Sequence, residues 1–343
     1  MVDGEFPISH TPHTPHLPTS PSPPISPSPT LSMLNPLIQA YTPLICWTGL
    51  GILSVRFLPT RFPYWLGRGL YWIGVPIEIF SLARQTTFDE RAQLAPTITV
   101  ASLLLGLGLG WVSIQIWKRL QPDRPAPTPG LSGSLLLCSM LGNTGFVGLA
   151  IVPYFVSPTD LSWAVLYSVT QNVFGTYGLG VLVSSYYGRQ GTAKNNWWVQ
   201  LKDLCSVPSL WGFALGSLTR MIPFPESIES SLHASIWVVI PGAFILMGIR
   251  LSQIQGWQSL KLALLPAILK TIVMPTVVGV TITMMGMSGD PRLGLVLMSG
   301  MPCAFAGLIL AEEYHLDGNL VASSIIVSTL IFLVMIPVWL YFY

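Results

Sequence analysis

Ten apolar stretches separated by short polar segments fill the sequence from residue 36 onward. Each is about long enough for an α-helix to cross the roughly 30 Å hydrocarbon core of a lipid bilayer. The predicted spans lie near residues 36–55, 64–82, 95–117, 131–155, 161–187, 204–221, 232–250, 261–286, 291–312 and 319–342. The pattern therefore predicts an all-α membrane protein with ten transmembrane helices.

Residues 1–32 differ in composition from the rest of the chain. They are rich in Pro, Ser, Thr and His and contain few bulky apolar residues, so they cannot bury a hydrophobic core. They also lack the basic start and the apolar region of a signal peptide. We predict a disordered tail for residues 1–32.

A weak internal similarity relates the fourth span to the ninth. The fourth contains MLGNTGFVGLA and the ninth contains MSGMPCAFAGLILA. Each has Met, then Gly, then a polar or Pro interruption, followed by small residues and Phe. Because an odd number of spans separates the two positions, related halves would insert in opposite orientations. We predict two inverted five-helix repeats, residues 33–187 and 204–343, joined by a cytoplasmic linker at residues 188–203.

The interruptions in these two spans carry the predicted chemistry. A broken helix leaves backbone groups unpaired, which costs several kcal/mol each in lipid, so a break survives only inside protein or beside water. The N-termini of half-helices carry partial positive charge and attract anions. A kinked helix packed through small residues is the alternative. The predicted substrate-binding positions at the two breaks are Asn143, Thr144, Gly145, Pro302 and Cys303.

Four further polar residues are candidates for the transport path. Lys270 lies well inside the eighth span, where a cation is costly and often functional; pairing with a backbone carbonyl or snorkelling to the surface is the alternative. Gln171 and Asn172 lie in the fifth span, where interhelical hydrogen bonding is an equal alternative. Glu78 lies nearer a helix end, and a structural or interfacial role competes with a functional one.

The positive charges predict the orientation in the membrane, because cytoplasmic loops carry an excess of Lys and Arg. The loops after the odd-numbered spans contain Arg56, Arg61, Arg68, Lys118, Arg119, Arg124, Arg189, Lys194, Lys202, Arg250 and Lys261. The opposite loops contain only Arg84, Arg91, Arg220 and Arg292. The first set should therefore face the cytoplasm, which places both termini outside it.

Composition excludes several classes of function. Only 9% of the residues are charged and 51% are hydrophobic, whereas soluble domains carry about a quarter charged residues. The sequence has no basic stripe of the kind that would indicate a nucleic-acid partner. It also has no buried pair of aspartates, no HExxH motif and no phosphate-binding glycine loop, which would indicate an enzyme. The four cysteines are far apart in apolar runs, so we predict no disulfide framework, no metal site and no cofactor.

Several motifs together resemble the auxin efflux carrier family, which includes the PIN-type carriers and many bacterial relatives. They are NTGFVGLA (143–150), PSLWGFALGSL (208–218), PGAFILMGIRLS (241–252) and MPCAFAGLILAEEYHLDGNLVASSIIVSTL (301–330). The resemblance covers roughly residues 34–343. It implies broken helices 4 and 9 that cross at the membrane midplane, with Asn143 beside the crossing and Pro302 at the second break. Two positions depart from the family pattern: Ala150 stands where Pro is frequent, and Ala306 where a polar residue is frequent.

The resemblance also implies a mechanism and partners. Helices 1, 2, 6 and 7 would form the scaffold of a homodimer, and helices 3–5 and 8–10 an elevator-type transport domain. The expected function is secondary active or facilitative transport of small organic anions, auxin-like or dicarboxylate-like, in a bacterial inner membrane. A carrier like the bile-acid/sodium symporters and an anion channel are the alternatives.

Overall fold

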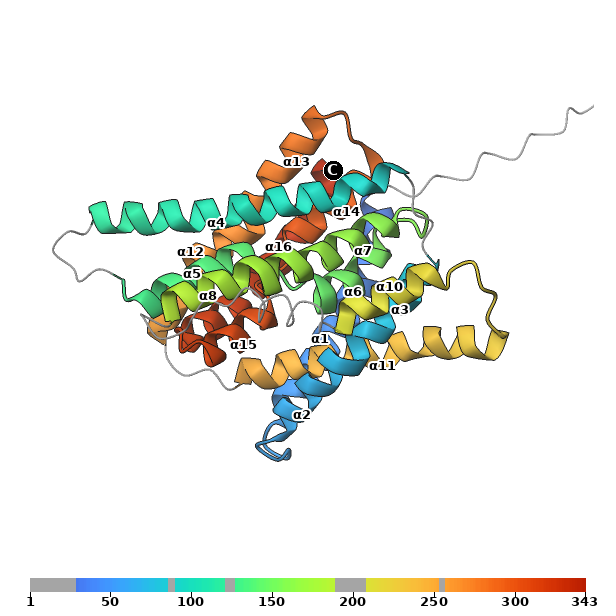
Figure 1. Ribbon diagram of the computed structural model, residues 1–343, viewed down its shortest axis with the longest axis horizontal. Helices are drawn as coiled ribbons and strands as arrows, with labels where there is room; N and C mark the ends of the chain where they lie inside the picture. The colour runs from blue at the N-terminus through green and yellow to red at the C-terminus, as the bar shows by residue number, and fades with distance from the viewer. Residues whose placement is uncertain (1–28, 86–89, 121–126, 189–207, 253–256) are drawn as a thin grey trace, which may run out of the picture.

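The computed structural model describes residues 29–85, 90–120, 127–188, 208–252 and 257–343, and every element named in these ranges is a helix (Figure 1). Within these ranges, five helices are long and apolar enough to cross a membrane, namely Leu37–Ser54, Leu94–Leu120, Glu226–Ser252, Leu260–Met284 and Gly318–Phe342. The prediction of an all-α, multi-pass membrane protein is therefore confirmed.

Helical segments occupy part of each predicted span. The first half contains α1 (Pro29–Ser54), α2 (Phe62–Gly69), η1 (Leu70–Gly74), α3 (Val75–Gln85), η2 (Glu90–Gln93), α4 (Leu94–Leu120), α5 (Pro129–Met140), η3 (Thr144–Gly148), α6 (Leu149–Ile151), η4 (Val152–Tyr154), α7 (Leu161–Thr170), η5 (Gln171–Gly180) and α8 (Val181–Gly188). The second half contains α10 (Pro208–Leu218), α11 (Glu226–Ser252), α12 (Trp257–Ile268), η6 (Leu269–Val273), α13 (Met274–Met284), α14 (Gly289–Ser299), α15 (Phe305–Glu313) and α16 (Gly318–Phe342). The inverted relation of the two halves stays a prediction.

Two of the predicted segments lie partly outside the described residues. Helix α1 begins at Pro29, inside the segment predicted to be a disordered tail, and residues 1–28 lie outside the described residues. The predicted cytoplasmic linker at residues 188–203 also lies outside them from residue 189 onward.

Both predicted interruptions are present. Helix α5 ends at Met140, and Leu141 adopts an extended backbone with φ −88° and ψ 121° before the wide π-helical turn of η3 begins at Thr144. Helix α14 ends at Ser299, and α15 begins only at Phe305. In both places the composition accounts for the break, because Gly and Pro are the weakest helix formers and Asn favours caps over helix interiors.

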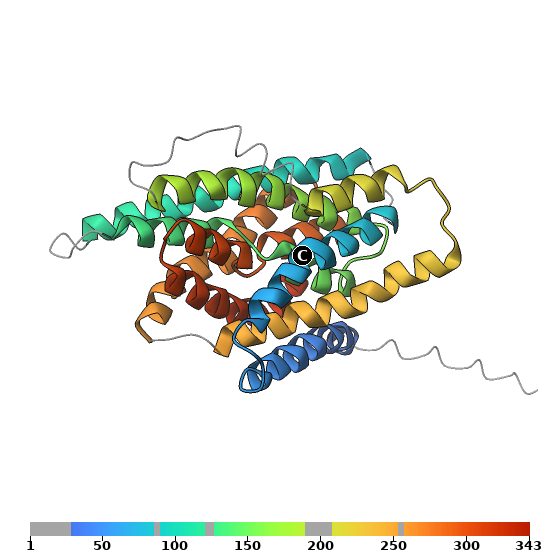
Figure 2. The same ribbon diagram turned by 60° about the horizontal axis from the view of Figure 1, so that its bottom comes forward.

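The helices pack in two groups. Helix α1 packs along α11, and α3 packs along α10 and α11, as Figure 2 shows for α1 in blue beside α11 in yellow and orange. Glycines permit the close approach of α1 and α11, since a side chain on Gly51 would collide with the backbone of Ile245 and one on Gly248 with that of Thr48. The other group contains α4, α5, α7, α8 and α12–α16, whose largest contacts are α12 with α16 and α4 with α5.

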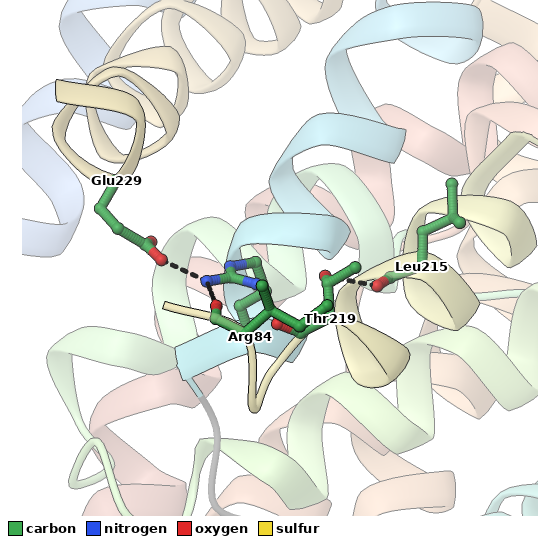
Figure 3. A network of polar contacts seen from close by, with 5 residues as sticks. Arg84, Leu215, Thr219 and Glu229 are labelled. Carbon is green, nitrogen blue, oxygen red and sulfur yellow. Dashed lines mark hydrogen bonds and ion pairs between the residues drawn. The ribbon is translucent and has the colours of Figure 1, made fainter. Parts of the chain in front are cut away.

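A network around Arg84 fastens the end of α3 to the turn between α10 and α11 (Figure 3). The Arg84 guanidinium forms an ion pair with Glu229 and donates hydrogen bonds to the carbonyl oxygens of Thr219 and Ile222. Its Cζ atom lies 3.7 Å from the centroid of the Phe224 ring, which adds a cation–π contact. This side chain therefore links the end of α3 to the turn after α10 and to the first turn of α11.

Candidate functional site

The two helix breaks lie side by side and satisfy each other's backbone groups. The amide N of Asn143 donates to the carbonyl O of Pro302 at 2.6 Å, and the amide N of Ala304 donates to the carbonyl O of Leu141 at 3.0 Å. An antiparallel bridge pairs Gly142 with Cys303 between them. Because unpaired backbone groups are costly away from water, this mutual pairing explains how two broken helices persist in the interior.

Asn143 shapes the turn that follows the first break. Its side-chain oxygen accepts a hydrogen bond from the amide N of Phe146 at 3.3 Å. Its carbonyl oxygen accepts from the amides of Val147 and Gly148 at 3.2 and 3.0 Å. Asn143 thus acts as the N-cap of η3.

Lys270 lies directly behind the crossing. Its side chain is only 1% exposed, and its Nζ donates to the carbonyl O of Ser299, the last residue of α14, at 2.8 Å. A Cβ atom on Gly142 would lie 2.9 Å from Cε of Lys270, so the two breaks and the ammonium group share one small volume. Among the described residues no carboxylate forms an ion pair with Lys270. A lysine at a helix C-terminus interacts favourably with the partial negative charge there.

Gln171 connects η5 to the first break. Its Nε2 donates to the carbonyl O of Gly142 and, at 3.1 Å, to Oγ1 of Thr144. Both side chains are buried. Gln171 therefore bonds between helices, which was one of the two readings left open by the sequence. It is the second donor to the carbonyl O of Gly142, which also accepts from the amide N of Thr144 at 2.9 Å.

Cys303 is held by residues that sequence reasoning missed. Its amide N donates to Oγ of Ser328 on α16 at 2.9 Å, and its Sγ donates to the carbonyl O of Cys138 on α5 at 3.2 Å. Only a general signal pointed to Ser328, namely the serines four residues apart in the otherwise apolar α16. Hydroxyl groups inside a transmembrane helix are expected to bond within their own helix or to a neighbour.

One side of the crossing is more open than the other. Gly145, Asn172, Phe305 and Ala306 are half-buried, whereas Thr144, Cys303 and Lys270 are buried. A Cβ atom on Gly145 would lie 3.9 Å from Nδ2 of Asn172, so the Asn172 amide lies close to this open side. The N-cap of α15, Ala304, has no side chain that can accept a hydrogen bond.

Glu78 is not part of the crossing itself. It lies on α3, and the residue one turn before it, Val75, places Cγ1 3.9 Å from the position of a Cβ on Gly145. Glu78 is 1% exposed, and its role stays a prediction. The structure thus brings together Asn143, Thr144, Gly145, Pro302, Cys303, Lys270, Gln171 and Asn172, and leaves Glu78 at the edge.

Comparison with known proteins supports the assignment to a transporter family. A family model described as "Membrane transport protein" matches residues 73–340. An uncharacterized transporter of Methanocaldococcus jannaschii is 29% identical over 212 residues, which cover 60% of this chain and 67% of the relative. An uncharacterized transporter of Methanothermobacter thermautotrophicus is 25% identical over 275 residues, which cover 80% of this chain and 87% of the relative.

The family match covers most of the chain, including both helix breaks, Gln171 and Lys270. It agrees with the resemblance carried by the motifs around residues 143–150 and 301–330. The chain therefore belongs to the membrane transport protein family of PIN-like carriers.

Proposed function

We propose that this protein is a secondary carrier of small organic anions and that the paired helix breaks form its binding site. The observation that carries the proposal is the Lys270 ammonium group, which is buried beside the breaks without a carboxylate partner among the described residues. A buried charge without a counter-ion is strongly unfavourable. An anionic substrate supplies the missing counter-charge, and this gain in free energy favours binding at this position.

The open side of the crossing offers groups that suit a carboxylate. Helix α15 begins there without a side-chain cap, and the first amides of a helix are natural donors to an anion. The Asn172 amide beside Gly145 adds a neutral donor. Phe146, which follows Gly145, and Phe305, the first residue of α15, are half-buried and offer apolar surface for the rest of an organic acid. These features favour an organic anion over an inorganic one.

An elevator-type movement is the mechanism that we propose for transport. The predicted scaffold helices correspond to α1, α2, α3, α10 and α11, which pack mainly with one another and lie together along the lower side of the molecule in Figure 1. The predicted transport helices contain both breaks and Lys270. The proposal also includes two inverted repeats and a homodimer formed through the scaffold helices. The protein would lie in a bacterial inner membrane with both termini outside the cytoplasm.

Counterflow in proteoliposomes tests the function. Vesicles loaded with unlabelled succinate or indole-3-acetate should accumulate the same labelled anion transiently, which a carrier produces and a channel does not. Lys270→Met should lower this signal at least about tenfold, as expected when about 1.4 kcal/mol of binding is lost. Lys261→Met is the matched control, because Lys261 lies exposed on α12 of the same span.

The proposal fails in either of two outcomes. Folded wild-type protein that shows no counterflow with a panel of monocarboxylates and dicarboxylates does not carry organic anions. Equal counterflow by Lys270→Met and Lys261→Met would show that the Lys270 ammonium group does not take part in anion binding.

A further inference from the structure

Glu78 is a second buried ionisable group. It lies on α3, one turn after the residue that contacts the first break. Its side chain is 1% exposed, and its Oε1 has no hydrogen-bond partner among the described residues. The ion pair of α3 involves Arg84, whose guanidinium is directed to Glu229 and to the α10–α11 turn. Glu78 is therefore a buried carboxyl group without the partner that an ionised form requires.

The neighbours of α3 show where Glu78 is directed. Val75 approaches Gly145 of η3, and Gly74 approaches Val239 of α11. At about 100° per residue, Glu78 is separated from Val75 by about 60° and from Gly74 by about 40° around the helix axis. Its side chain thus lies on the face between η3 and α11, one turn beyond the contact with the first break.

The ionisable residues on the elements packed against α3 are few. Helix α10 has none, α7 has Tyr167 and η1 has Tyr71. Helix α11 has Glu226, Glu229, His233 and Arg250, which lie toward its two ends, and α3 itself carries Arg84. The side chain of His233 lies outside the described residues. No ion pair among the described residues involves Glu78.

An ionised carboxylate in such a place is costly, because it has lost water without gaining a partner. The carboxyl group is therefore neutral and holds a proton while α3 and η3 are in contact. If the segment carrying η3 moves along α3, water reaches Glu78 and the carboxyl can release its proton. The chemistry is a simple dissociation, in which the carboxylic acid gives its proton to water and no other bond changes.

Anion binding at the crossing reinforces proton binding at Glu78. A bound carboxylate places negative charge near the same contact, and a nearby like charge favours the protonated form of a carboxyl group. The coupling is reciprocal, so a protonated Glu78 also raises the affinity for the anion. Proton and anion therefore bind together and leave together.

We propose that Glu78 is a proton-binding site that couples the carrier to a proton gradient, with one proton moving in the same direction as each anion. The coupling rests on the proposed anion transport, whereas the proton site itself does not.

Infrared spectroscopy of the full-length protein in liposomes tests the proton site without a substrate. At neutral pH the wild type should show the C=O stretching band of a protonated carboxylic acid, shifted in D₂O, and Glu78→Gln should lack it. Glu78→Asp should keep a shifted band if Glu78→Gln fails to fold. Glu312→Gln is the matched control, because Glu312 is exposed on α15 and should contribute no such band. A wild-type spectrum without the band, or a band unaffected by Glu78→Gln, would overturn the proposal.

Transport under an imposed gradient tests the coupling. With the membrane potential clamped at zero, a gradient of one pH unit should raise the accumulation ratio of labelled succinate up to about tenfold in the wild type. In Glu78→Gln the accumulation ratio should be about the same with and without the gradient, whereas Glu312→Gln should keep the stimulation of the wild type. If the wild type shows counterflow but no stimulation by the pH gradient, the proton coupling is wrong and the proposed anion transport still holds. If the wild type shows no counterflow, the proposed anion transport is wrong, and the infrared experiment alone tests the proton site.

Discussion

Replacing Gly142 by alanine places a methyl group where the Lys270 side chain lies. The new Cβ would lie 2.9 Å from Cε and 3.1 Å from Nζ of Lys270, and 3.3 Å from the carbonyl O of Met301. Carbon atoms pack at about 3.5–4.0 Å, so Lys270 has to move by roughly 0.6–1.1 Å. Such a displacement can lengthen the 2.8 Å bond from Nζ to Ser299 beyond the usual limit of about 3.2 Å.

The expected cost follows from these two effects. A hydrogen bond from a charged group contributes about 1.5–3 kcal/mol, and overpacking a buried site costs about 1–3 kcal/mol. The two terms overlap, because moving Lys270 relieves the steric contact while it breaks the hydrogen bond. We therefore expect Gly142→Ala to lower the free energy of unfolding by about 1.5–3 kcal/mol. Counterflow should fall further, because the ammonium group leaves the site.

Thermal unfolding of the purified protein in detergent, together with counterflow, measures both effects. Gly108→Ala on α4 is the control, since nothing lies within 4 Å of a Cβ there and alanine favours a helix over glycine by about 1 kcal/mol. Lys270→Ala removes Cε, so Gly142→Ala should add little in that background, and the double-mutant cycle should show strong coupling. Strictly additive effects of the two substitutions, or a Gly142→Ala protein as stable and active as Gly108→Ala, would refute the geometry of the crossing.

Five further variants probe the network around the site and its support. Arg84→Met should destabilise the protein by about 1.5–3 kcal/mol, because it removes hydrogen bonds donated by a charged group. Glu229→Gln should cost less since the bonds from Arg84 to the carbonyl groups remain; equal Tm values for the two variants would contradict this. Gln171→Leu should lower the Tm through the loss of two hydrogen bonds at about 1 kcal/mol each, and Thr144→Val should lower it less because it removes one of them. The reverse order would show that Gln171 bonds mainly to the Thr144 hydroxyl and not to the Gly142 carbonyl. Asn143→Asp keeps an acceptor for capping but places a negative charge at a buried position, so both the Tm and succinate counterflow should fall. Retained counterflow would show that Asn143 is not part of the anion site.

The sequence predicted the two breaks because their signals are local. Glycine, proline and asparagine disfavour helix interiors wherever they occur, so the positions near Gly142 and Pro302 could be identified without a partner. The depth of Lys270 could also be predicted, since it follows from counting residues along an apolar span. The substrate-binding roles of these residues stay predictions.

The pairing of the breaks could not be predicted in detail. It consists of backbone groups, such as the Asn143 amide with the Pro302 carbonyl, which leave no signature in side chains. The same holds for the Ser299 carbonyl that receives the Lys270 hydrogen bond. The neighbours that bury Glu78 could not be predicted for a related reason: they come from tertiary packing of α3 against α11 and η3.

The position of Lys270 also predicts that transport is independent of sodium. The carbonyl end of α14 attracts cations, and the Lys270 ammonium already occupies it through Ser299. A sodium ion bound about 4 Å away would be repelled by about 4 kcal/mol at an effective dielectric constant of 20, which corresponds to nearly a thousandfold loss of affinity. Replacing sodium by choline should therefore leave the succinate counterflow of the wild type unchanged. A loss of about tenfold or more in choline would mean that a cation binds elsewhere in the crossing and would favour a sodium symporter. Lys270→Met removes the repulsion, so a sodium dependence that arises only in this variant would confirm that the ammonium group takes the place of an ion.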